Sequence, residues 1–462
     1  MRNWLSGLCA AALLCSLCGC GSVSGGSQAP MDSSSTMAAP ASSTSISQLD
    51  TLSRELTATG IHCATDTGYY YLAEDWKELK DGHVGMALLY VDYASRQEVY
   101  LCSDSGCSHD TDRCSAIFSD AEFILGSSAL FVYQDKLYLL SKESDNDNSY
   151  STQQTSGDIV DFLADPRPAA LYRMNLDGTN REKVYAFDPA LTVEDWVFGD
   201  PSGLYFITKK LDTRQSGSTQ FVSSTDRQVM RLDLDKAALE SVQPLNLDDK
   251  TNWTVLGCAG SRLILSGVVY QKELTDQEAL DNDTWKAAYL DSTTRYMALD
   301  LNTGAQQQLA ELSNQNLTSD LVADGYLYLS QPTDQNITRY DPATGEKKVV
   351  AKLKQNNLLS TLGGKLCCRD WDLSKDFTYY FVDPSTGKVQ HSKLVNKRLG
   401  WDLEFLAEND RDALVIYDYE ATPGTGKGLY NISQYKLALI DKNDLFQGVD
   451  RFQPIQMTGK GR

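Results

Sequence analysis

Residues 325–350 read GYLYLSQPTDQNITRYDPATGEKKVV, and this stretch contains the pattern that decides the fold. A Tyr-rich apolar run at 325–329 is followed by a run that ends at Asp341, a Pro-Ala-Thr-Gly turn and a further run at 348–350. Short apolar runs bounded by turn residues are typical of β-strands. Asp or Pro early and Gly late is the order that tight turns require. The stretch therefore predicts successive antiparallel strands joined by turns.

The same pattern recurs seven times with a period of about 58 residues, which indicates a repeat architecture. The runs that end in Asp or Asn close at Asp92, Asn175, Asp233, Asp300, Asp341, Asp383 and Asp441. The Tyr-rich or aliphatic runs that precede them lie at 68–72, 136–140, 203–207, 262–265, 325–329, 365–368 and 413–417. A further short apolar segment ahead of most copies, such as 253–256, completes a unit of four short strands.

Seven four-stranded units in a row predict an all-β fold, a β-propeller of seven blades with four antiparallel strands each. A single four-stranded sheet leaves both of its faces uncovered. Radial packing of blades buries those faces, and closing the ring protects the strand edges. Because the prediction rests on a pattern rather than on an invariant motif, six or eight blades remain alternatives.

The first twenty residues predict an export signal. Arg2 precedes an apolar run of about 14 residues, shorter than the roughly 20 that span a bilayer. Leu17-Cys18-Gly19-Cys20 resembles the lipobox of bacterial lipoproteins, in which the residue at the position of Cys20 is diacylated on sulfur and becomes the mature N-terminus. The alternative is an ordinary secretory peptide that is rich in cysteine. We expect a signal peptide at 1–19 and a protein held by lipid on the extracellular face of the cell membrane.

Composition divides the remainder into a tether and one domain. Residues 20–48 are dominated by Gly, Ser, Ala, Pro and Thr, which is typical of a flexible linker. Residues 49–462 contain no second linker and form the predicted propeller domain. The formal net charge of −20 argues against nucleic acid as a partner and against binding to anionic lipid by charge alone. Solvated surface charge explains it most simply.

The longest predicted loops fall on one face of the propeller. Four of them join the second and third strands of a blade, at 143–169, 209–226, 267–294 and 418–433, and a fifth lies at 73–85. Long loops on a rigid scaffold often carry binding sites, although loops also lengthen without a function. They contain aromatic side chains that could stack on a sugar or a peptide: Trp76, Tyr150, Trp285, Tyr289, Tyr419 and Tyr430. Residues 275–290 predict a short helix with Thr275 and Glu278 as a capping box.

One cluster offers ligand chemistry. Cys102, Cys107, His109 and Cys114 form the spacing C-x4-C-x-H-x4-C in the loop that leaves the first blade. Three sulfurs and an imidazole suit tetrahedral Zn²⁺. The sequence leaves three states open: disulfides, with Cys63 as a fourth sulfur, a zinc site, or free thiols. Either bonded state would staple the connection from blade one to blade two.

The run from Cys102 through Cys107-Ser108-His109 to Cys114, just after Gly68-Tyr69-Tyr70-Tyr71 and a strand that ends in Asp92, resembles a group of propeller lipoproteins. They come from anaerobic Gram-positive bacteria of the clostridial kind. Members have Pro just before the second Cys motif, where this chain has Ser105-Gly106. The resemblance covers about residues 68–120 specifically and the rest through the blade pattern. It implies a propeller fold and a lipid anchor, and it implies no activity.

Catalytic motifs are weak. The four histidines are His62, His83, His109 and His391, and none lies in a nucleophile elbow or a zinc-protease helix. Cys367 and Cys368 are adjacent in a predicted strand, where their side chains point to opposite faces, which opposes a disulfide between them. We expect a surface binding or scaffold protein whose ligand is a glycan, a peptide or a protein. The alternative is an extracellular carbohydrate-active enzyme, a lyase or a hydrolase.

The anchor is testable by a single substitution. We predict that Cys20→Ala releases the protein to the medium or leaves it unprocessed, because the acylated sulfur is lost. Fractionation of producing cells, with intact-mass analysis, measures both outcomes. Cys18→Ala is the matched control and should stay anchored. A Cys20→Ala protein that remains on the membrane at the mature mass would contradict the lipobox.

Overall fold

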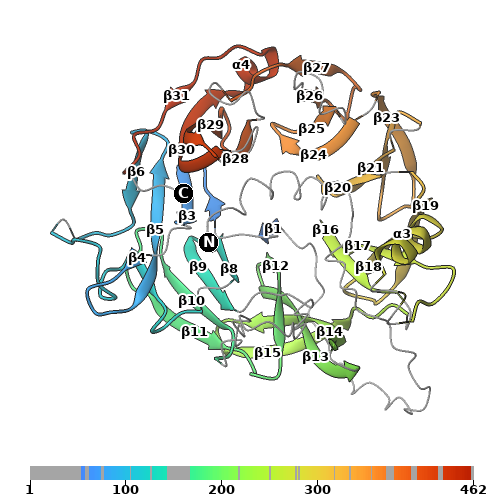
Figure 1. Ribbon diagram of the computed structural model, residues 1–462, viewed down its shortest axis with the longest axis horizontal. Coiled ribbons are helices and arrows are strands. Elements are labelled where there is room, and N and C mark those ends of the chain that lie inside the picture. The colour runs from blue at the N-terminus through green and yellow to red at the C-terminus, as the bar shows by residue number, and fades with distance from the viewer. Residues whose placement is uncertain are drawn as a thin grey trace.

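The computed structural model describes residues 54–57, 62–73, 77–104, 106–124, 127–142, 167–216, 219–248, 251–275, 278, 281–316, 318–331, 334–354, 356–370, 379–396, 403–424 and 430–458. Its strands form seven sheets around a central axis (Figure 1). Each sheet is built on four antiparallel strands in sequence order, and two sheets carry additional strands, so the predicted seven-bladed β-propeller is confirmed.

The blades follow one another along the chain from the N-terminus to the C-terminus. Blade one contains β2 (His62–Ala64), β3 (Gly68–Leu72), β5 (Val84–Asp92) and β6 (Gln97–Tyr100). Blade two contains β8 (Ser127–Tyr133), β9 (Lys136–Lys142), β10 (Ala170–Asn175) and β11 (Glu182–Ala186). Blade three contains β12 (Thr192–Asp200), β13 (Gly203–Ser216), β14 (Thr219–Asp233) and β15 (Ala238–Pro244). Blade four contains β16 (Trp253–Ala259), β17 (Arg262–Val269), β18 (Thr293–Asp300) and β19 (Gln306–Ser313).

The last three blades have the same order. Blade five contains β20 (Ser319–Ala323), β21 (Tyr326–Ser330), β22 (Asn336–Tyr340) and β23 (Lys347–Lys352). Blade six contains β24 (Asn356–Leu362), β25 (Lys365–Asp370), β26 (Tyr379–Val382) and β27 (Val389–Ser392). Blade seven contains β28 (Glu404–Glu408), β29 (Asp412–Pro423), β30 (Tyr430–Asp441) and β31 (Gln453–Pro454), with helix α4 (Lys442–Gln447) between the last two strands.

The repeated Asp residues close the turns between the third and fourth strands, as the repeat predicted. The Asp300 carboxylate accepts the backbone N–H groups of Asn302 (3.0 Å) and Thr303 (3.1 Å). Asp341 and Asp383 accept the N–H groups two and three residues ahead in the same way. Asp92 does so after β5. These side-chain caps fix the turn geometry, because an Asp carboxylate can replace a backbone acceptor there.

The hydrophobic core lies between blades rather than within one layer. Cys367 packs in the cluster shared by blades six and seven, with Val415 and Ile440. Cys368, the next residue, packs in the cluster shared by blades five and six, with Tyr328 and Ile337. The opposite orientations predicted for these two side chains are therefore confirmed. Each sheet contributes both of its faces to the core.

Two of the predicted long loops are continuous β-hairpins instead. β13 and β14 pair from Leu204–Leu232 out to Ser216–Thr219, while the pairing of β13 with β12 ends at Lys209. β29 and β30 pair out to Pro423–Tyr430, while β28 pairs only as far as Ile416. Residues 143–166 of the blade-two loop lie outside the described residues. The blade-four insertion carries helix α3 (Asn282–Leu290), capped by Asp281. Ahead of it, Thr275 and Glu278 exchange the hydrogen bonds of the predicted capping box.

Blade one and the channel contain strands that the repeat did not predict. β4 (Lys77–Glu78) and β7 (Ile117–Ser119) pair with the first residues of β5, next to the blade-one sheet. β1 (Arg54–Thr57) lies inside the ring and pairs antiparallel with β12, the inner strand of blade three, with Arg54 opposite Gly199 (Figure 1). β1 therefore extends the sheet of blade three toward the propeller axis.

The ring closes without exchange of a strand. All of blade one comes from the start of the propeller and all of blade seven from its end. After β31, Gln456 bridges to Gln97 of β6 in parallel, and the N–H of Glu98 donates to the carbonyl of Gln456 (2.9 Å). The Glu98 carboxylate accepts the N–H (2.9 Å) and hydroxyl (2.7 Å) of Thr458 and the hydroxyl of Tyr71. We call residues 455–458 the C-terminal latch. Among the described residues, no helix has the length and apolar character needed to cross a membrane.

A buried carboxyl between blades four and five makes stability depend on pH. The Tyr296 hydroxyl donates to Asp320 (3.1 Å), and burial raises the pKa of Asp320 from 3.8 to about 6. Because the folded pKa is the higher one, the folded state holds this proton more tightly. The associated stability is complete below about pH 4 and is lost as the pH rises through about 6.

We predict that Asp320→Asn loses less stability than the parent between pH 4 and pH 7, by on the order of 1 kcal/mol, because the amide cannot ionise. Urea unfolding at the two pH values measures the difference. Asp324→Asn, in the exposed turn after β20, is the control and should follow the parent. Equal pH dependence in the parent and Asp320→Asn would contradict the raised pKa.

Candidate metal centre

The predicted cysteine–histidine cluster comes together in the loop between β6 and β7. The Asp104 carboxylate accepts the N–H of Gly106 (2.9 Å), and its carbonyl accepts the N–H of Cys107 (3.2 Å). His109 follows in a left-handed conformation with φ of 52°. The Thr111 carbonyl then accepts the N–H of Cys114 (3.2 Å). These tight turns fold the polar loop back on itself, so residues separated by only a few positions face one another.

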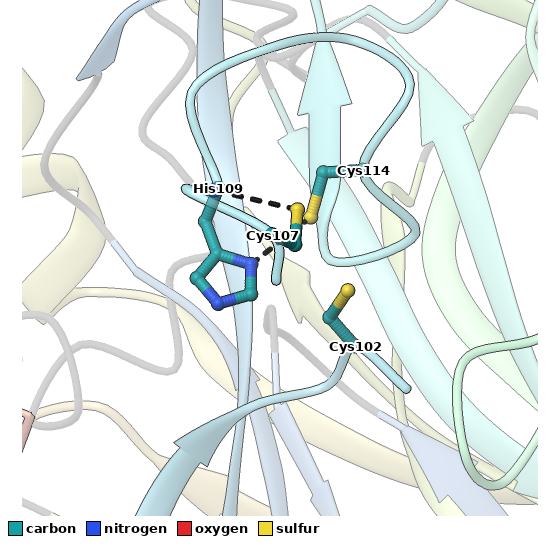
Figure 2. Close-up of side chains that lie close together, drawn as sticks. All are labelled: Cys102, Cys107, His109 and Cys114. Carbon is teal, nitrogen blue, oxygen red and sulfur yellow. Dashed lines mark hydrogen bonds between the residues drawn. The ribbon is translucent and has the colours of Figure 1, made fainter. Parts of the chain in front are cut away.

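The four side chains converge on one point. The ligand atoms of Cys102, Cys107, His109 and Cys114 all lie within 4.8 Å of one another (Figure 2). His109 Nδ1 lies 3.2 Å from Cys114 Sγ, and the His109 N–H donates to Cys107 Sγ (3.4 Å). Ligand atoms around a tetrahedral Zn²⁺ lie about 3.5–3.8 Å apart, given Zn–S and Zn–N bonds of about 2.3 and 2.0 Å. This group can therefore hold a metal ion after small adjustments of its side chains.

A tyrosine holds the imidazole of His109, and a lysine holds its backbone. The Tyr100 ring, at the end of β6, stacks on His109 with centroids 4.3 Å apart and planes at 10°. Lys77 of β4 donates from Nζ to the His109 carbonyl (2.5 Å). Neither residue was predicted from the sequence. The aromatic at the end of the strand before the loop was the only available signal for Tyr100, and no local signal pointed to Lys77.

The electrostatics favour a neutral imidazole. Burial, followed by the nearby Lys77 ammonium, lowers the pKa of His109 below its ordinary value. A neutral imidazole is the form that binds a metal. His109 therefore needs little or no deprotonation to become a ligand near neutral pH.

The thiols of Cys102 and Cys114 have pKa values shifted in opposite directions. Burial raises the pKa of Cys102, but a hydrogen bond with the backbone of Asp104 and the side chains of Ser115, Cys114 and Cys107 more than offset this, so the net pKa lies below its ordinary value. Burial, and then the neighbouring Cys107 and Cys102, raise the pKa of Cys114 to about 12. Three sulfurs this close cannot all ionise without a cation, because like charges oppose one another. A divalent ion would relieve that repulsion.

The remaining cysteines lie elsewhere. Cys102, Cys107 and Cys114 are free thiols in the structure. Cys63 of β2 packs against the core shared by blades one and two, whereas the cluster packs against the core of blades one and seven. The structure thus does not place Cys63 as a fourth sulfur of the cluster. In the described part of the chain, the Cys102–Cys114 cluster is the one group of three or more His, Cys, Asp or Glu side chains that could hold a metal.

Three of the six aromatic side chains predicted for a ligand face lie in the described part of the chain. Trp76, Tyr150 and the side chain of Tyr430 lie outside the described residues, as does Cys20. Trp285 and Tyr289 of α3 are half-buried and stack on each other with centroids 5.5 Å apart. Tyr419 is only 5% exposed and packs edge-on against Tyr435 in the core of blades one and seven. Its ring therefore serves packing and is not available to a ligand.

Comparisons with known proteins concern the fold alone. No family model and no curated protein matches the sequence. Among solved structures, the chain is similar to puromycin hydrolase at 12% identity and a TM-score of 0.46, covering 88% of this chain and 54% of that one. It is similar to an oligogalacturonate lyase in complex with manganese, at 12% identity, a TM-score of 0.41 and 84% of each chain. It also matches TolB from Acinetobacter baumannii at 12% identity and a TM-score of 0.31, covering 83% and 78%. The chain spans about half the length of puromycin hydrolase.

Proposed function

We propose that this protein is a lipid-anchored β-propeller of the cell surface that binds a glycan, a peptide or a protein on its loop-rich face. The observation that carries the proposal is the placement of the insertions. The β13–β14 hairpin, the β29–β30 hairpin and helix α3 all join second and third strands of their blades. In a propeller these connections share one face. We call it the insertion face.

The β13–β14 and β29–β30 hairpins both extend well beyond the inner strands of their blades. Beyond the last residue that pairs with the inner strand, β13 continues for seven residues, from Lys210 to Ser216. At about 3.3 Å per residue, this is a projection of roughly 23 Å. β29 projects similarly, from Tyr417 to Pro423. Paired strands hold their shape better than open loops, so the hairpins can present side chains at defined positions on either side of the propeller axis.

The predicted anchor and tether also favour a ligand site on the insertion face. Predicted lipid attachment at Cys20 and the tether at 20–48 lead into β1, which lies inside the ring on β12. β1 covers the edge of β12, the inner strand of blade three, that would otherwise face the propeller axis. The projecting insertions are therefore the favoured surface for a ligand.

The enzyme alternative finds no acid–base pair at the described hollow. A hollow of about 580 Å³ lies in the blade-four insertion and is lined by Lys272, Glu273, Thr275, Glu278, Asp281 and Thr284. The Lys272 ammonium and the Thr275 hydrogen bonds lower the pKa of Glu278 to about 2, and hydrogen bonds from Thr284 lower that of Asp281. Glycoside cleavage needs one carboxyl with a raised pKa as the acid. Instead, Asp281 caps helix α3, and Glu278 is held by Lys272 and Thr275 ahead of that helix.

Binding to the insertion face is tested with a hairpin variant. We predict that the full chain binds members of an array of glycans, peptidoglycan fragments and peptides, and that deleting 212–223 with an Asn-Gly turn in their place lowers affinity at least about tenfold. A loss of this size is expected when a few contacts dominate binding. Pro384→Ala, in the β26–β27 turn on the opposite face, is the control. Binding that survives the deletion and is lost in the control would place the ligand on the other face.

We also propose that Zn²⁺ occupies the Cys102–Cys114 cluster. Four protein ligands leave no open position, so the ion would be structural and would supply cross-linking rather than catalysis. Sulfur and imidazole ligands suit Zn²⁺ better than Mg²⁺ or Ca²⁺. Disulfides remain the competing state, because exported proteins meet oxidants.

The two states are separated by metal analysis and mass. We predict that the full chain carries zinc and that His109→Ala lowers the content by about one ion per chain together with a fall in folding stability, because structural zinc contributes folding free energy. His391→Ala, an exposed histidine of β27, is the matched control and should keep the ion. Equal metal content in the parent and His109→Ala, with cysteine masses lowered in pairs, would establish disulfides instead.

A further inference from the structure

The Cys102–Cys114 cluster lies in residues 101–116, between β6 and β7, which we call the metal loop. The metal loop and the C-terminal latch contact the same face of β6. Glu98 and Tyr100 of β6 are two residues apart, so their side chains point to the same side of the strand. Glu98 is 4% exposed and holds the latch through Thr458. Tyr100 stacks on His109 of the metal cluster. Val99, between them, points the other way and is 42% exposed.

The loop and the latch also share one core. Cys114 is buried in the cluster that contains Leu437 and Leu439 of blade seven and Ile455 of the latch. Cys102, Cys107 and Met457 pack against that cluster. The sulfurs lie in the predicted connection from blade one to blade two, and they pack against the joint between the first and last blades.

The backbone contact across this joint is short. One parallel bridge joins Gln456 to Gln97. The N–H of Glu98 donates to the carbonyl of Gln456, and the N–H of Gln456 donates to the carbonyl of Arg96, both at 2.9 Å. The other six junctions between neighbouring blades are continuous in the chain, whereas this one joins residues near the two ends of the domain. Side-chain packing, these two backbone hydrogen bonds and the hydrogen bonds of the Glu98 carboxylate stabilise it.

The metal loop and β7 also contact blade two. Arg181, in the turn before β11, donates from Nη1 to the carbonyls of Ser115 (3.3 Å) and Ile117 (2.8 Å). Its guanidinium lies over the rings of Phe118 and Phe123, 4.8 and 5.0 Å from their centroids. The same turn approaches the loop so closely that a Cβ at Gly178, where φ is +81°, would lie 2.5 Å from the Leu101 carbonyl. The loop thus contacts both neighbours of blade one.

We propose that zinc in the Cys102–Cys114 cluster is the clasp of the ring: it holds the loop against Tyr100 and the blade-seven core, and so keeps β6 in place for the latch. The inference rests on the zinc proposed above. Release of the ion loosens the joint between blades one and seven while the other blades stay packed. By thermodynamic reciprocity, if zinc favours the closed latch by a given factor, the closed latch favours zinc binding by the same factor, so opening the latch weakens zinc binding by up to that factor.

Hydrogen exchange on the full chain tests the first half. We expect that removing zinc with a chelator raises amide exchange in 453–458 and 97–100 by about tenfold, within the range of coupling free energies between protein sites. The outer strands β19 and β23, which have the same role in blades four and five, are the internal controls and should not change. Restoring zinc should restore protection.

A latch variant tests the second half without altering a ligand. Glu98→Gln keeps one oxygen for Thr458 but loses the acceptor for the Tyr71 hydroxyl. We expect it to bind one zinc per chain at the cluster with about five- to tenfold lower affinity. Glu240→Gln, the same change on the exposed outer strand β15 of blade three, is the matched control and should bind as the parent does.

The outcomes separate the two proposals. Zinc content that does not depend on His109 overturns the zinc centre and the clasp together. Zinc that binds one to one, but whose removal alters exchange only within 102–114, leaves the zinc centre standing and overturns the clasp. A uniform rise in exchange over all seven blades, or unchanged zinc affinity in Glu98→Gln, also overturns the clasp.

Discussion

The packing of blade seven against blade one is the interaction on which the rest of the ring depends. Every sheet buries two apolar faces, and six of the seven junctions join blades that are neighbours in the chain. The seventh junction joins Tyr69 and Tyr71 to Leu437 and Leu439, more than 360 residues apart, and must overcome the entropy of closing that loop. Without it, two apolar sheet faces would remain exposed to water.

Local pattern was enough to predict the blades, because each blade is built from neighbouring residues. The spacing of apolar runs gave the strand order, and the Asp caps at Asp300, Asp341 and Asp383 are set within four residues of sequence. The hairpin extensions were predicted as loops because the sequence beyond Lys210 is mostly polar and shows no regular alternation of apolar and polar residues. β1 could not be predicted at all: its four residues gain a partner only from β12, which lies about 140 residues further along the chain.

For the metal cluster too, the local geometry could be predicted from the sequence, whereas its tertiary position could not. The convergence of Cys102, Cys107, His109 and Cys114 follows from a short spacing and tight turns, so the sequence predicted it correctly. Its position on the joint of blades one and seven follows from ring closure, which is a tertiary event. The sequence therefore placed the staple at the next blade along the chain, where Arg181 does make contact. The contact with blade seven, whose residues come from the C-terminal part of the chain, was not predicted.

The joint between blades one and seven determines how rigidly the proposed ligand face is held. A ligand that contacts both hairpins would bridge blade three and blade seven, and their separation is fixed only if the ring is closed. Blade seven is held on one side by its continuous connection to blade six and on the other by the Glu98 latch and the Cys114 core. A loose joint would let the β29–β30 hairpin move with its blade, and binding would then pay the entropy of fixing it. A metal centre at this joint would preorganise the insertion face without touching the ligand, which explains why a cluster with no open coordination position would stand beside the one discontinuous junction in the ring.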